Sequence, residues 1–355
     1  MKLNRFHFIL GLAIFSMFFG AGNTIFPLLL GVETGKNYFF AFLGLLLTGV
    51  GGPLLGLLAA TSFQGSGVAF FQTAGKKTGL ALMTVSLALL GPFAVLPRCV
   101  EVARAAFEPV FPFLHPWAFN TTFCLFALFC AVRRKAVLPA LGYVLSPFLL
   151  GCLFLIIVQG FFAPHSPSLG MPPLPSFKLG FVTGYDTMDL IASLFFSAGI
   201  WSMVSDRYQG HPRNIFRATL TGGMVGMILL AVIYLGLAFV ASKYANELQA
   251  VPHERIMSRL ALLTLGPSWG LVASLAVVLA CLTTVISLMM TISTTIKGPS
   301  YVLLNVAIAA ITLAMLGLGF DTIMHLIHTM VSFCYPIIIL LVIVNLARKK
   351  ILLAN

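Results

Sequence analysis

This sequence lacks the charged surface that a soluble protein needs. Asp, Glu, Lys and Arg make up only 8% of its 355 residues, whereas hydrophobic residues make up 59% and the mean hydropathy is +1.03. Soluble domains do not bury so large an apolar fraction. The composition therefore excludes a soluble enzyme or binding module. It predicts an all-α integral membrane protein with about ten spans of roughly 20 residues each.

The sequence also lacks a cysteine motif for metal binding and a cleavable signal peptide. The six cysteines lie mostly inside apolar runs and have no metal-type spacing, so we expect them to pack as small hydrophobic side chains. The first apolar run is longer than that of a signal peptide, and no cleavage site of small residues follows it. The first helix is therefore expected to be retained.

Ten apolar segments are present, and a Pro-rich stretch separates five from five. The segments are 6–30, 39–61, 79–97, 117–132, 136–162, 179–204, 215–241, 269–294, 300–319 and 322–346. The predicted organisation is a first five-helix unit (1–162), an outer linker (163–178), a second five-helix unit (179–346) and a basic cytoplasmic tail (347–355).

The net charge of +12 would indicate nucleic-acid binding in a soluble protein, but here its distribution indicates orientation in a membrane. The loops alternate between two faces, and the basic residues of the outer face share their loops with glutamates. Because basic loops stay inside, we expect both termini to be cytoplasmic. We expect lipid, and no nucleic acid, as a partner. Most of the 21 basic residues lie on the face of the N-terminus: Lys2, Arg5, Lys76, Lys77, Arg133, Arg134, Lys135, Arg207, Arg213, Arg217, Lys297, Arg348, Lys349 and Lys350.

The first segment is interrupted at 19–27 (FGAGNTIFP). Gly20 and Gly22 each cost roughly 1 kcal/mol relative to Ala in a helix, Asn23 is a favourable N-cap, and Pro27 fits near a helix start. We expect the helix to unwind at this glycine pair and to restart at about Thr24. Non-helical backbone at membrane depth must face protein or a watery cavity, so the break predicts a binding site. A kinked helix packed through small residues is the alternative.

The second half opens with a similar interruption at 180–189 (GFVTGYDTMD), ahead of a long apolar run. Asp186 and Asp189 would be expensive at membrane depth and are then usually functional. The alternative is that both acids cap a helix in the headgroup region. A break at Gly184–Asp189 would leave inner halves of equal length, 5–19 and 190–204. Each five-helix unit would then begin with an interrupted helix, and because five is odd the two units would cross the membrane in opposite directions. This pattern is typical of inverted-repeat transporters.

Three other groups of polar residues interrupt the apolar segments. Ala280, Thr283 and Thr284 place one carbonyl and two hydroxyls on one helical face, a set suited to an alkali cation, although Thr hydroxyls usually bond their own helix. Arg98 is predicted either to gate entry or bind an anion, or else to snorkel at the interface, with a short charged helix following it at the outer surface. Asp321, His325 and His328 share one face of the last segment near its outer end. We favour a polar helix end here over a metal site.

Three stretches together resemble the branched-chain amino acid:cation symporter family, the BrnQ-type carriers of bacterial inner membranes. They are 19–27, Gly91-Pro92 with Pro97-Arg98, and 180–189; the shorter 280–284 (ACLTT) and 334–336 (CYP) add to them. The resemblance runs through all ten segments. It implies a five-plus-five inverted-repeat fold with broken helices 1 and 6. The chain ends at Asn355, before the further C-terminal helices that relatives tend to have, which leaves the oligomeric state open.

The predicted function is cation-coupled import of leucine, isoleucine or valine across the bacterial inner membrane. Segment one has no Glu or Lys at its centre to carry a proton, which favours sodium as the coupling ion. An intramembrane aspartyl protease using Asp186 and Asp321, and a passive channel, are the alternatives. The expected substrate-binding residues are Ala21, Gly22, Asn23, Thr24, Tyr185, Asp186 and Asp189. The expected sodium ligands are Ser16, Phe19, Ala280, Thr283 and Thr284.

Overall fold

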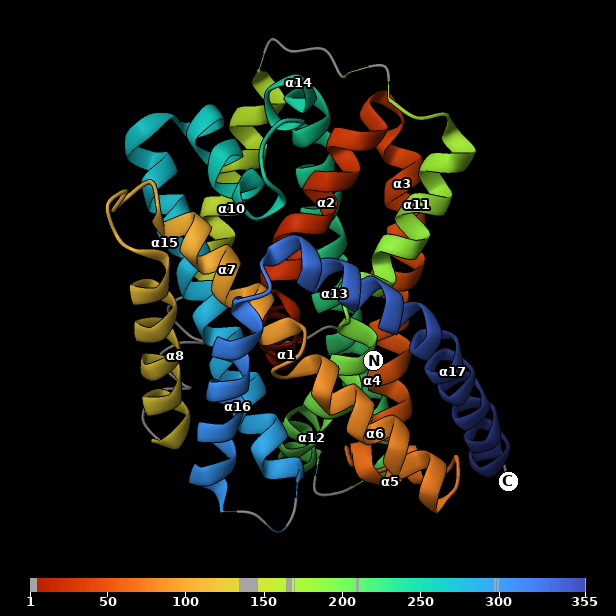
Figure 1. The fold of residues 1–355 in the computed structure, drawn as a ribbon. Helices are drawn as coiled ribbons and strands as arrows, with labels where there is room; N and C mark the ends of the chain where they lie inside the picture. The colour runs from red at the N-terminus through yellow and green to blue at the C-terminus, as the bar shows by residue number, and fades with distance from the viewer. Residues whose placement is uncertain are drawn as a thin grey trace.

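Helices overlie every predicted apolar segment in the residues that the structure describes. This computed structural model describes residues 5–133, 146–163, 168, 170–208, 211–296, 298 and 300–354, and its regular elements there are all helical (Figure 1). Part of the fifth predicted segment, 136–145, lies outside the described residues. Five helical stretches are long and apolar enough to cross a membrane, and one bent helix pair would make a sixth. Four shorter apolar helices accompany them.

The first span is broken, as predicted, but the helix restarts earlier than predicted. Helix α1 (Arg5–Phe18) ends before Phe19, and α2 (Ala21–Thr34) begins directly after Gly20, whose backbone is extended with φ −128° and ψ −161°. The predicted restart at Thr24 is therefore wrong by three residues. Asn23 is not the N-cap, because Gly20 takes that position without any side-chain hydrogen bond and the Asn23 amide is used in a tertiary contact.

The remaining described elements of the first half are also helical. Their bounds are η1 (Gly35–Asn37), α3 (Tyr38–Leu45), the π-helix η2 (Leu46–Gly51), α4 (Gly52–Thr61), α5 (Gly67–Gln72), α6 (Lys76–Leu90), α7 (Val95–Phe107), α8 (Pro116–Val132) and α10 (Ser146–Phe162). Segment three is thus interrupted at Gly91-Pro92 and continues as α7. The predicted outer charged helix is part of α7, and Glu101 is buried at 5% exposure, bonded to Arg104 and Asn120, instead of lying at the surface.

The second half begins with the other bent helix pair. Helix α11 (Pro173–Asp186) and α12 (Asp189–Tyr208) meet at an angle of 41°, with the break at Thr187-Met188, inside the predicted range. Helix α11 takes in the end of the predicted linker because Pro173 suits a first helical position. The other elements are α13 (Pro212–Lys243), α14 (Ala245–Leu248), η4 (His253–Arg255), α15 (Ile256–Thr295, kinked at Gly266), α16 (Tyr301–Leu316) and α17 (Phe320–Ala354).

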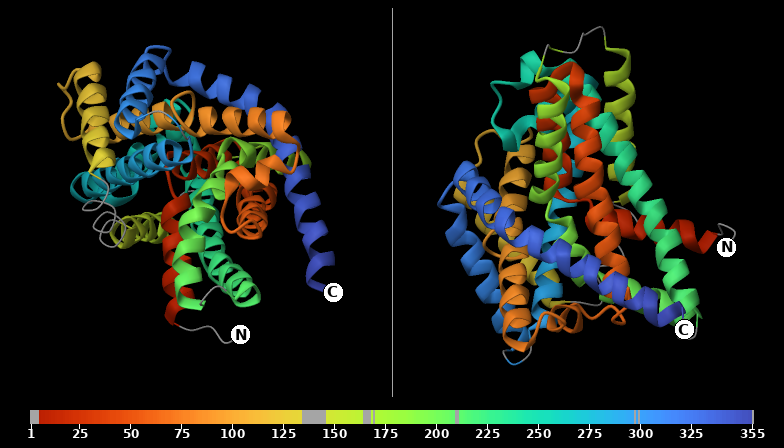
Figure 2. Two further views of the ribbon diagram at one scale, coloured as in Figure 1. Left: turned by 90° about the horizontal axis from the view of Figure 1, so that it is seen from below. Right: turned by 90° about the vertical axis from the view of Figure 1, so that its right-hand side faces the viewer.

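Long-range packing brings the two breaks together in the middle of the bundle. Helix α11 packs on α3, where a Cβ on Gly180 would meet the Ala41 carbonyl, and on η2, where the Thr48 hydroxyl donates to the Phe181 carbonyl at 2.8 Å. Helices α1 and α2 both pack on α13, and α7 packs on α15. Helix α17 runs along the outside of the bundle, with Phe333 75% exposed (Figure 2). The chain is therefore arranged around the interrupted helices.

Candidate functional site

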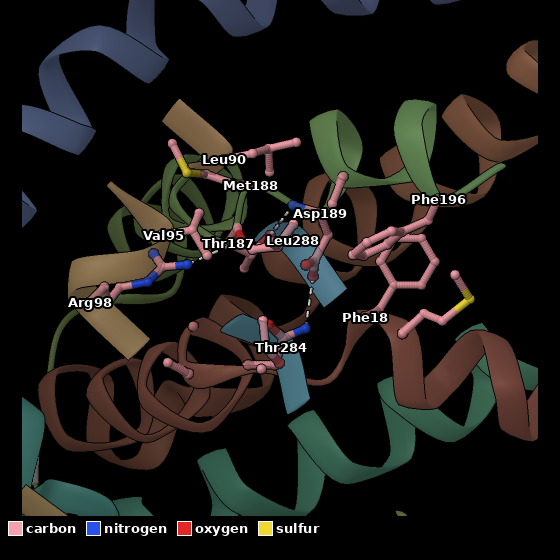
Figure 3. A pocket seen from close by; sticks show the side chains of 16 residues that line it. Phe18, Leu90, Val95, Arg98, Thr187, Met188, Asp189, Phe196, Thr284 and Leu288 are labelled. Atoms are coloured by element: carbon pink, nitrogen blue, oxygen red, sulfur yellow. Dashed lines mark hydrogen bonds between the residues drawn. The ribbon is translucent and has the colours of Figure 1, made fainter. Parts of the chain in front are cut away.

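The two helix breaks face one cavity (Figure 3). It contains about 330 Å³ of empty space, including the part that is open to solvent. The polar lining residues are Asn23, Arg98, Thr187, Asp189 and Thr284, and the first break adds Gly20, Ala21 and Gly22. The apolar lining residues are Met17, Phe18, Leu90, Val95, Met188, Ala192, Phe196 and Leu288.

A hydrogen-bonded network joins the first break to the second. The Asn23 side-chain amide donates to Asp189 Oδ2 at 2.8 Å and to the Tyr234 hydroxyl at 2.6 Å, and the Tyr234 hydroxyl lies 3.4 Å from the same Asp189 oxygen. Asn23 and Asp189 are 2% and 4% exposed, and Tyr234 is fully buried. A buried carboxylate needs such donors because protein and lipid interiors solvate charge poorly. This burial argues against the alternative in which Asp189 caps a helix among headgroups.

The structure divides the predicted substrate residues into two groups. Ala21, Gly22, Asn23 and Asp189 line the cavity. Thr24 is buried and donates its hydroxyl to the Ala21 carbonyl at 2.8 Å, so it supports the first turn of α2 and does not line the cavity. Tyr185 and Asp186 are also absent from the cavity wall, because they precede the break and lie on the end of α11 that faces α17.

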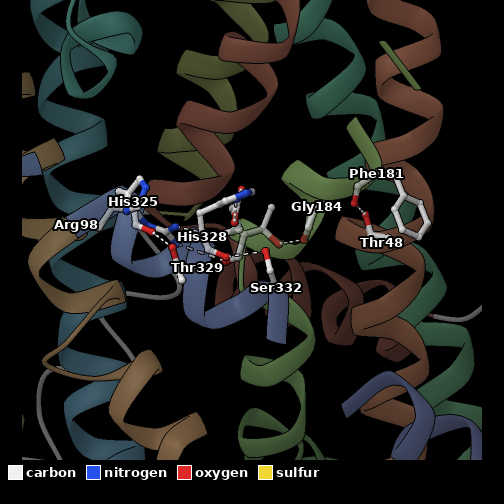
Figure 4. A network of polar contacts seen from close by, with 10 residues as sticks. Thr48, Arg98, Phe181, Gly184, His325, His328, Thr329 and Ser332 are labelled. Atoms are coloured by element: carbon white, nitrogen blue, oxygen red, sulfur yellow. Dashed lines mark hydrogen bonds and ion pairs between the residues drawn. The ribbon is translucent and has the colours of Figure 1, made fainter. Parts of the chain in front are cut away.

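The Tyr185 and Asp186 side chains both contact helix α17. The Tyr185 ring packs against Tyr335 with centroids 5.1 Å apart. The Asp186 carboxylate, in a residue only 8% exposed, lies 3.1 Å from Nδ1 of His328, whose side chain is 51% exposed (Figure 4). The burial of Asp186 argues against a headgroup cap here too. The prediction that Tyr185 and Asp186 enter the pocket is therefore not met, because the rotation of α11 points them at a helix from the end of the chain.

The polar residues of α17 do not form a metal site. His328 faces Asp186, whereas Asp321, with a 90% exposed side chain, lies 3.9 Å from His253. Within the described part of the chain, no group of three or more His, Cys, Asp or Glu residues could hold a metal ion. The two aspartates of the protease alternative also have different partners, because Asp186 contacts His328 and Asp321 lies near His253. They are therefore not paired as an aspartyl protease requires.

Arg98 lies at the centre of the site and is not an interfacial, snorkelling residue. It is 2% exposed, and Nη1 donates to the Asp186 carbonyl at 2.7 Å. Nη2 lies 3.4 Å from the Thr187 carbonyl, and the guanidinium carbon lies 5.2 Å from the centroid of the Phe26 ring. The side chain therefore bridges from α7 to the last carbonyls of α11, where the negative end of a helix dipole favours a cation.

The predicted cation ligands are only partly brought together. A Cβ on Gly20 would lie 3.1 Å from Thr284 Oγ1, so the first break does contact α15 as predicted. The Thr283 and Thr284 hydroxyls both donate to the Ala280 carbonyl, at 2.8 and 3.0 Å, which is the local bonding considered as the alternative. The Ser16 hydroxyl likewise donates within α1, to Leu12. The threonine hydroxyls still have lone pairs for a cation, whereas the Ala280 carbonyl is already occupied.

Two residues of the site were missed or left open by sequence reasoning. Tyr234 is not among the residues predicted from the sequence, although a single tyrosine inside the long apolar run of α13 is a signal that it needs a buried partner. For Arg98 the sequence leaves several roles open, because its place in the cavity depends on the helix continuing past Pro97 as α7. Phe18, Val95 and Phe196, which line the cavity, are indistinguishable in sequence from lipid-facing residues.

Comparison with known proteins agrees with this architecture. Solved structures with the same fold include a manganese transporter of Eremococcus coleocola (TM-score 0.61, 13% identity, 96% of this chain and 76% of that one). A Na⁺-coupled sialic acid symporter (TM-score 0.60, 10% identity, 96% and 78%) and MhsT in complex with L-phenylalanine (TM-score 0.59, 15% identity, 96% and 88%) also match. At these identities the likeness establishes the fold alone.

Sequence relatives establish the family. The chain is 32% identical over 347 residues to the branched-chain amino acid permease BrnQ of Corynebacterium glutamicum, covering 95% of this chain and 80% of the relative. It is 28% identical over 376 residues to a putative branched-chain amino acid carrier of Staphylococcus epidermidis, covering 98% and 83%. The family model for branched-chain amino acid transport proteins matches residues 4–355. The chain therefore belongs to the branched-chain amino acid transport protein family, and it is a multi-pass membrane transporter, not an enzyme.

Proposed function

We propose that this transporter is a secondary active importer of branched-chain L-amino acids, coupled to sodium. The observation that carries the proposal is the meeting of both helix breaks at one buried cavity, where Asn23 of the first break donates to Asp189 of the second. Broken helices that face each other at mid-membrane supply both polar backbone groups and dipole ends to a bound solute. The relatives, a branched-chain amino acid permease and a branched-chain amino acid carrier, suggest the substrate class.

The cavity has suitable partners for each part of a branched-chain amino acid. The N–H groups of Ala21 and Gly22, in the first turn of α2, would bind the carboxylate at the positive end of the helix dipole. Asp189 would bind the ammonium group. The branched side chain would lie against the apolar wall formed by Phe18, Val95 and Phe196. A mostly apolar pocket with a few convergent polar groups is typical of small-molecule sites.

Sodium would bind beside the substrate, between the first break and α15. Thr284 supplies a hydroxyl oxygen next to Gly20, and Thr283 shares its helix turn. Backbone carbonyls freed near Phe19 would add oxygens, which suits a hard cation. In α1 the residues that face the interior include no acid or lysine, so that helix offers no carboxyl group for proton coupling.

Uptake into proteoliposomes tests this function. The purified protein should accumulate labelled leucine against its gradient when sodium is higher outside. Accumulation should stop when sodium is replaced by choline or when its gradient is removed. A passive channel would equilibrate leucine at a rate independent of the ion gradient, which would contradict the proposal. Accumulation driven by a proton gradient alone would contradict the choice of ion.

The proposed location is a bacterial inner membrane with both termini in the cytoplasm. The support is the charge distribution, with Lys76, Lys77, Arg207 and Arg213 on the face of the N-terminus. Peptide tags at the two ends should both be protected from protease in intact spheroplasts and cleaved after the membrane is made permeable. Cleavage of either tag in intact spheroplasts would overturn this orientation.

A further inference from the structure

Arg98 is a buried cation without an anionic partner. The described residues include all nine Asp and Glu residues of the chain, and none of them lies within ion-pair distance of Arg98. The nearby carboxylates have other partners, since Asp186 faces His328 and Asp189 accepts from Asn23 and Tyr234. A charge at 2% exposure that has no direct ion pair is costly in a protein interior, and more so inside a membrane.

The protein satisfies only part of the guanidinium. Arginine has five N–H donors, and here Nη1 makes one good hydrogen bond, at 2.7 Å to the Asp186 carbonyl, while Nη2 is 3.4 Å from the Thr187 carbonyl. Nε is buried and has no hydrogen-bond partner in the structure. The side chain lines the cavity between the two breaks, so a bound molecule can reach it.

The same guanidinium also lies against the first turn of α2. A Cβ built on Gly22 would lie 2.7 Å from Arg98 Nη2, so any larger residue here would displace the guanidinium from the start of the helix. The first N–H groups of a helix have no partner within it and carry a partial positive charge. A full positive charge and a helix N-terminus therefore lie together at the cavity, and no acid of the described chain lies within ion-pair distance of Arg98.

We propose that Arg98 and the first turn of α2 together form the carboxylate subsite for the amino-acid substrate. The inference rests on the proposed function and adds its specificity-determining residue. The zwitterion would lie with its carboxylate on the cavity side of both the Arg98 guanidinium and the first turn of α2, and with its ammonium group toward Asp189. An α-carboxylate supplies the missing negative charge and can accept two parallel N–H bonds from a guanidinium. An analogue without this negative charge would leave the buried guanidinium without an anionic partner.

Paired ligands distinguish this role from a purely structural one. L-Leucine and L-leucinamide share the side chain and the ammonium group, but the amide lacks the negative charge. Binding of both is measured by competition on the purified full chain. The parent should prefer leucine by about tenfold or more, the usual size of a charge-assisted hydrogen bond. In Arg98→Gln leucine affinity should fall by about tenfold or more, while leucinamide affinity changes by less than about threefold.

Matched variants complete the test. Arg104→Gln, on the same helix but paired with Glu101, should keep the parent's preference. Arg98→Lys keeps the positive charge but lacks the two parallel N–H donors of a guanidinium, so the preference for leucine over leucinamide should fall by about threefold. This variant replaces Arg98→Gln in the test if Arg98→Gln does not fold. Equal losses for both ligands, or an unchanged preference in Arg98→Lys, would show that Arg98 only tethers α11. A parent that binds neither ligand would instead refute the proposed function.

Discussion

The two helix breaks perform the same task by different means. At the first break Gly20 has an extended backbone and starts α2 without any side-chain cap. At the second break the turn is made by Met188, a buried non-glycine residue with φ of 62°, in the left-handed region that costs an L-residue about 1–2 kcal/mol. The first break thus follows from local backbone preference. The second must be imposed by contacts with the rest of the protein.

Those contacts come from distant elements. Arg98 of α7 donates to the last carbonyl of α11, and Asn23 of α2 donates to the first carboxylate of α12. The first break in turn supplies backbone groups to the cavity, whereas the second supplies a charged side chain. A binding site with both kinds of group can therefore depend on one break specified by glycine and one held by long-range hydrogen bonds.

The largest effect is expected where a side chain is added at the first break. Gly22→Leu would place its Cβ 2.7 Å from Arg98 Nη2 and 3.2 Å from the Phe26 ring, filling the site. We expect leucine uptake into proteoliposomes to be lost while the protein remains inserted and monodisperse. Gly151→Leu is the matched control, since nothing lies within 4 Å of that position, and it should transport normally. Near-normal uptake by Gly22→Leu would refute the role of this break.

The next largest effect is expected at the second break, where the two acids should differ. Asp189→Asn removes the charge that faces the cavity, so leucine affinity should fall by about tenfold or more. Asp186→Asn should change it by less than about threefold, because that carboxylate faces His328. Asp321→Asn, with its side chain 90% exposed, is the control. Equal losses at 186 and 189, measured by equilibrium binding, would mean that both acids serve the site.

A smaller, ion-specific effect is expected beside the first break. Thr284→Val removes the hydroxyl next to Gly20, so sodium affinity should fall by about tenfold, and Thr283→Val should reduce it less. Leucine affinity at saturating sodium should stay close to that of the parent, whereas at low sodium it should fall, because coupling is reciprocal. Thr291→Val, which loses only a bond to Ser287, is the control. An unchanged sodium dependence in both variants would place the ion elsewhere.

The smallest effect concerns backbone strain at the second break. Met188→Ala and Met188→Gly remove the same buried side chain, so their difference in unfolding free energy reports the backbone alone. Glycine should be the more stable by about 1 kcal/mol, since it adopts a positive φ freely. At Met203, inside α12, alanine should instead be the more stable by about 1 kcal/mol. The same sign at both positions, in detergent unfolding experiments, would show that Met188 is not strained.

The sequence by itself determined the class of the protein and the places where its helices break. Scarcity of charge and long apolar runs require a membrane protein, because only lipid accommodates so much apolar surface. Gly20 and Gly22 weaken the helix wherever it packs, so the first break was predictable to within a few residues. The second break was located between Gly184 and Asp189 by symmetry with the first, and it lies at Thr187-Met188.

Only the tertiary structure decided which polar side chains share the cavity. Asp186 and Asp189 are three residues apart and look equivalent in the sequence, yet one faces α17 and the other faces α2. Arg98 and Tyr234 enter the site from helices whose rotation depends on packing against distant neighbours. Local sequence sets where a helix weakens, because backbone energies are local. The direction of each side chain depends on contacts that span the whole chain, such as the hydrogen bond from Asn23 to Asp189.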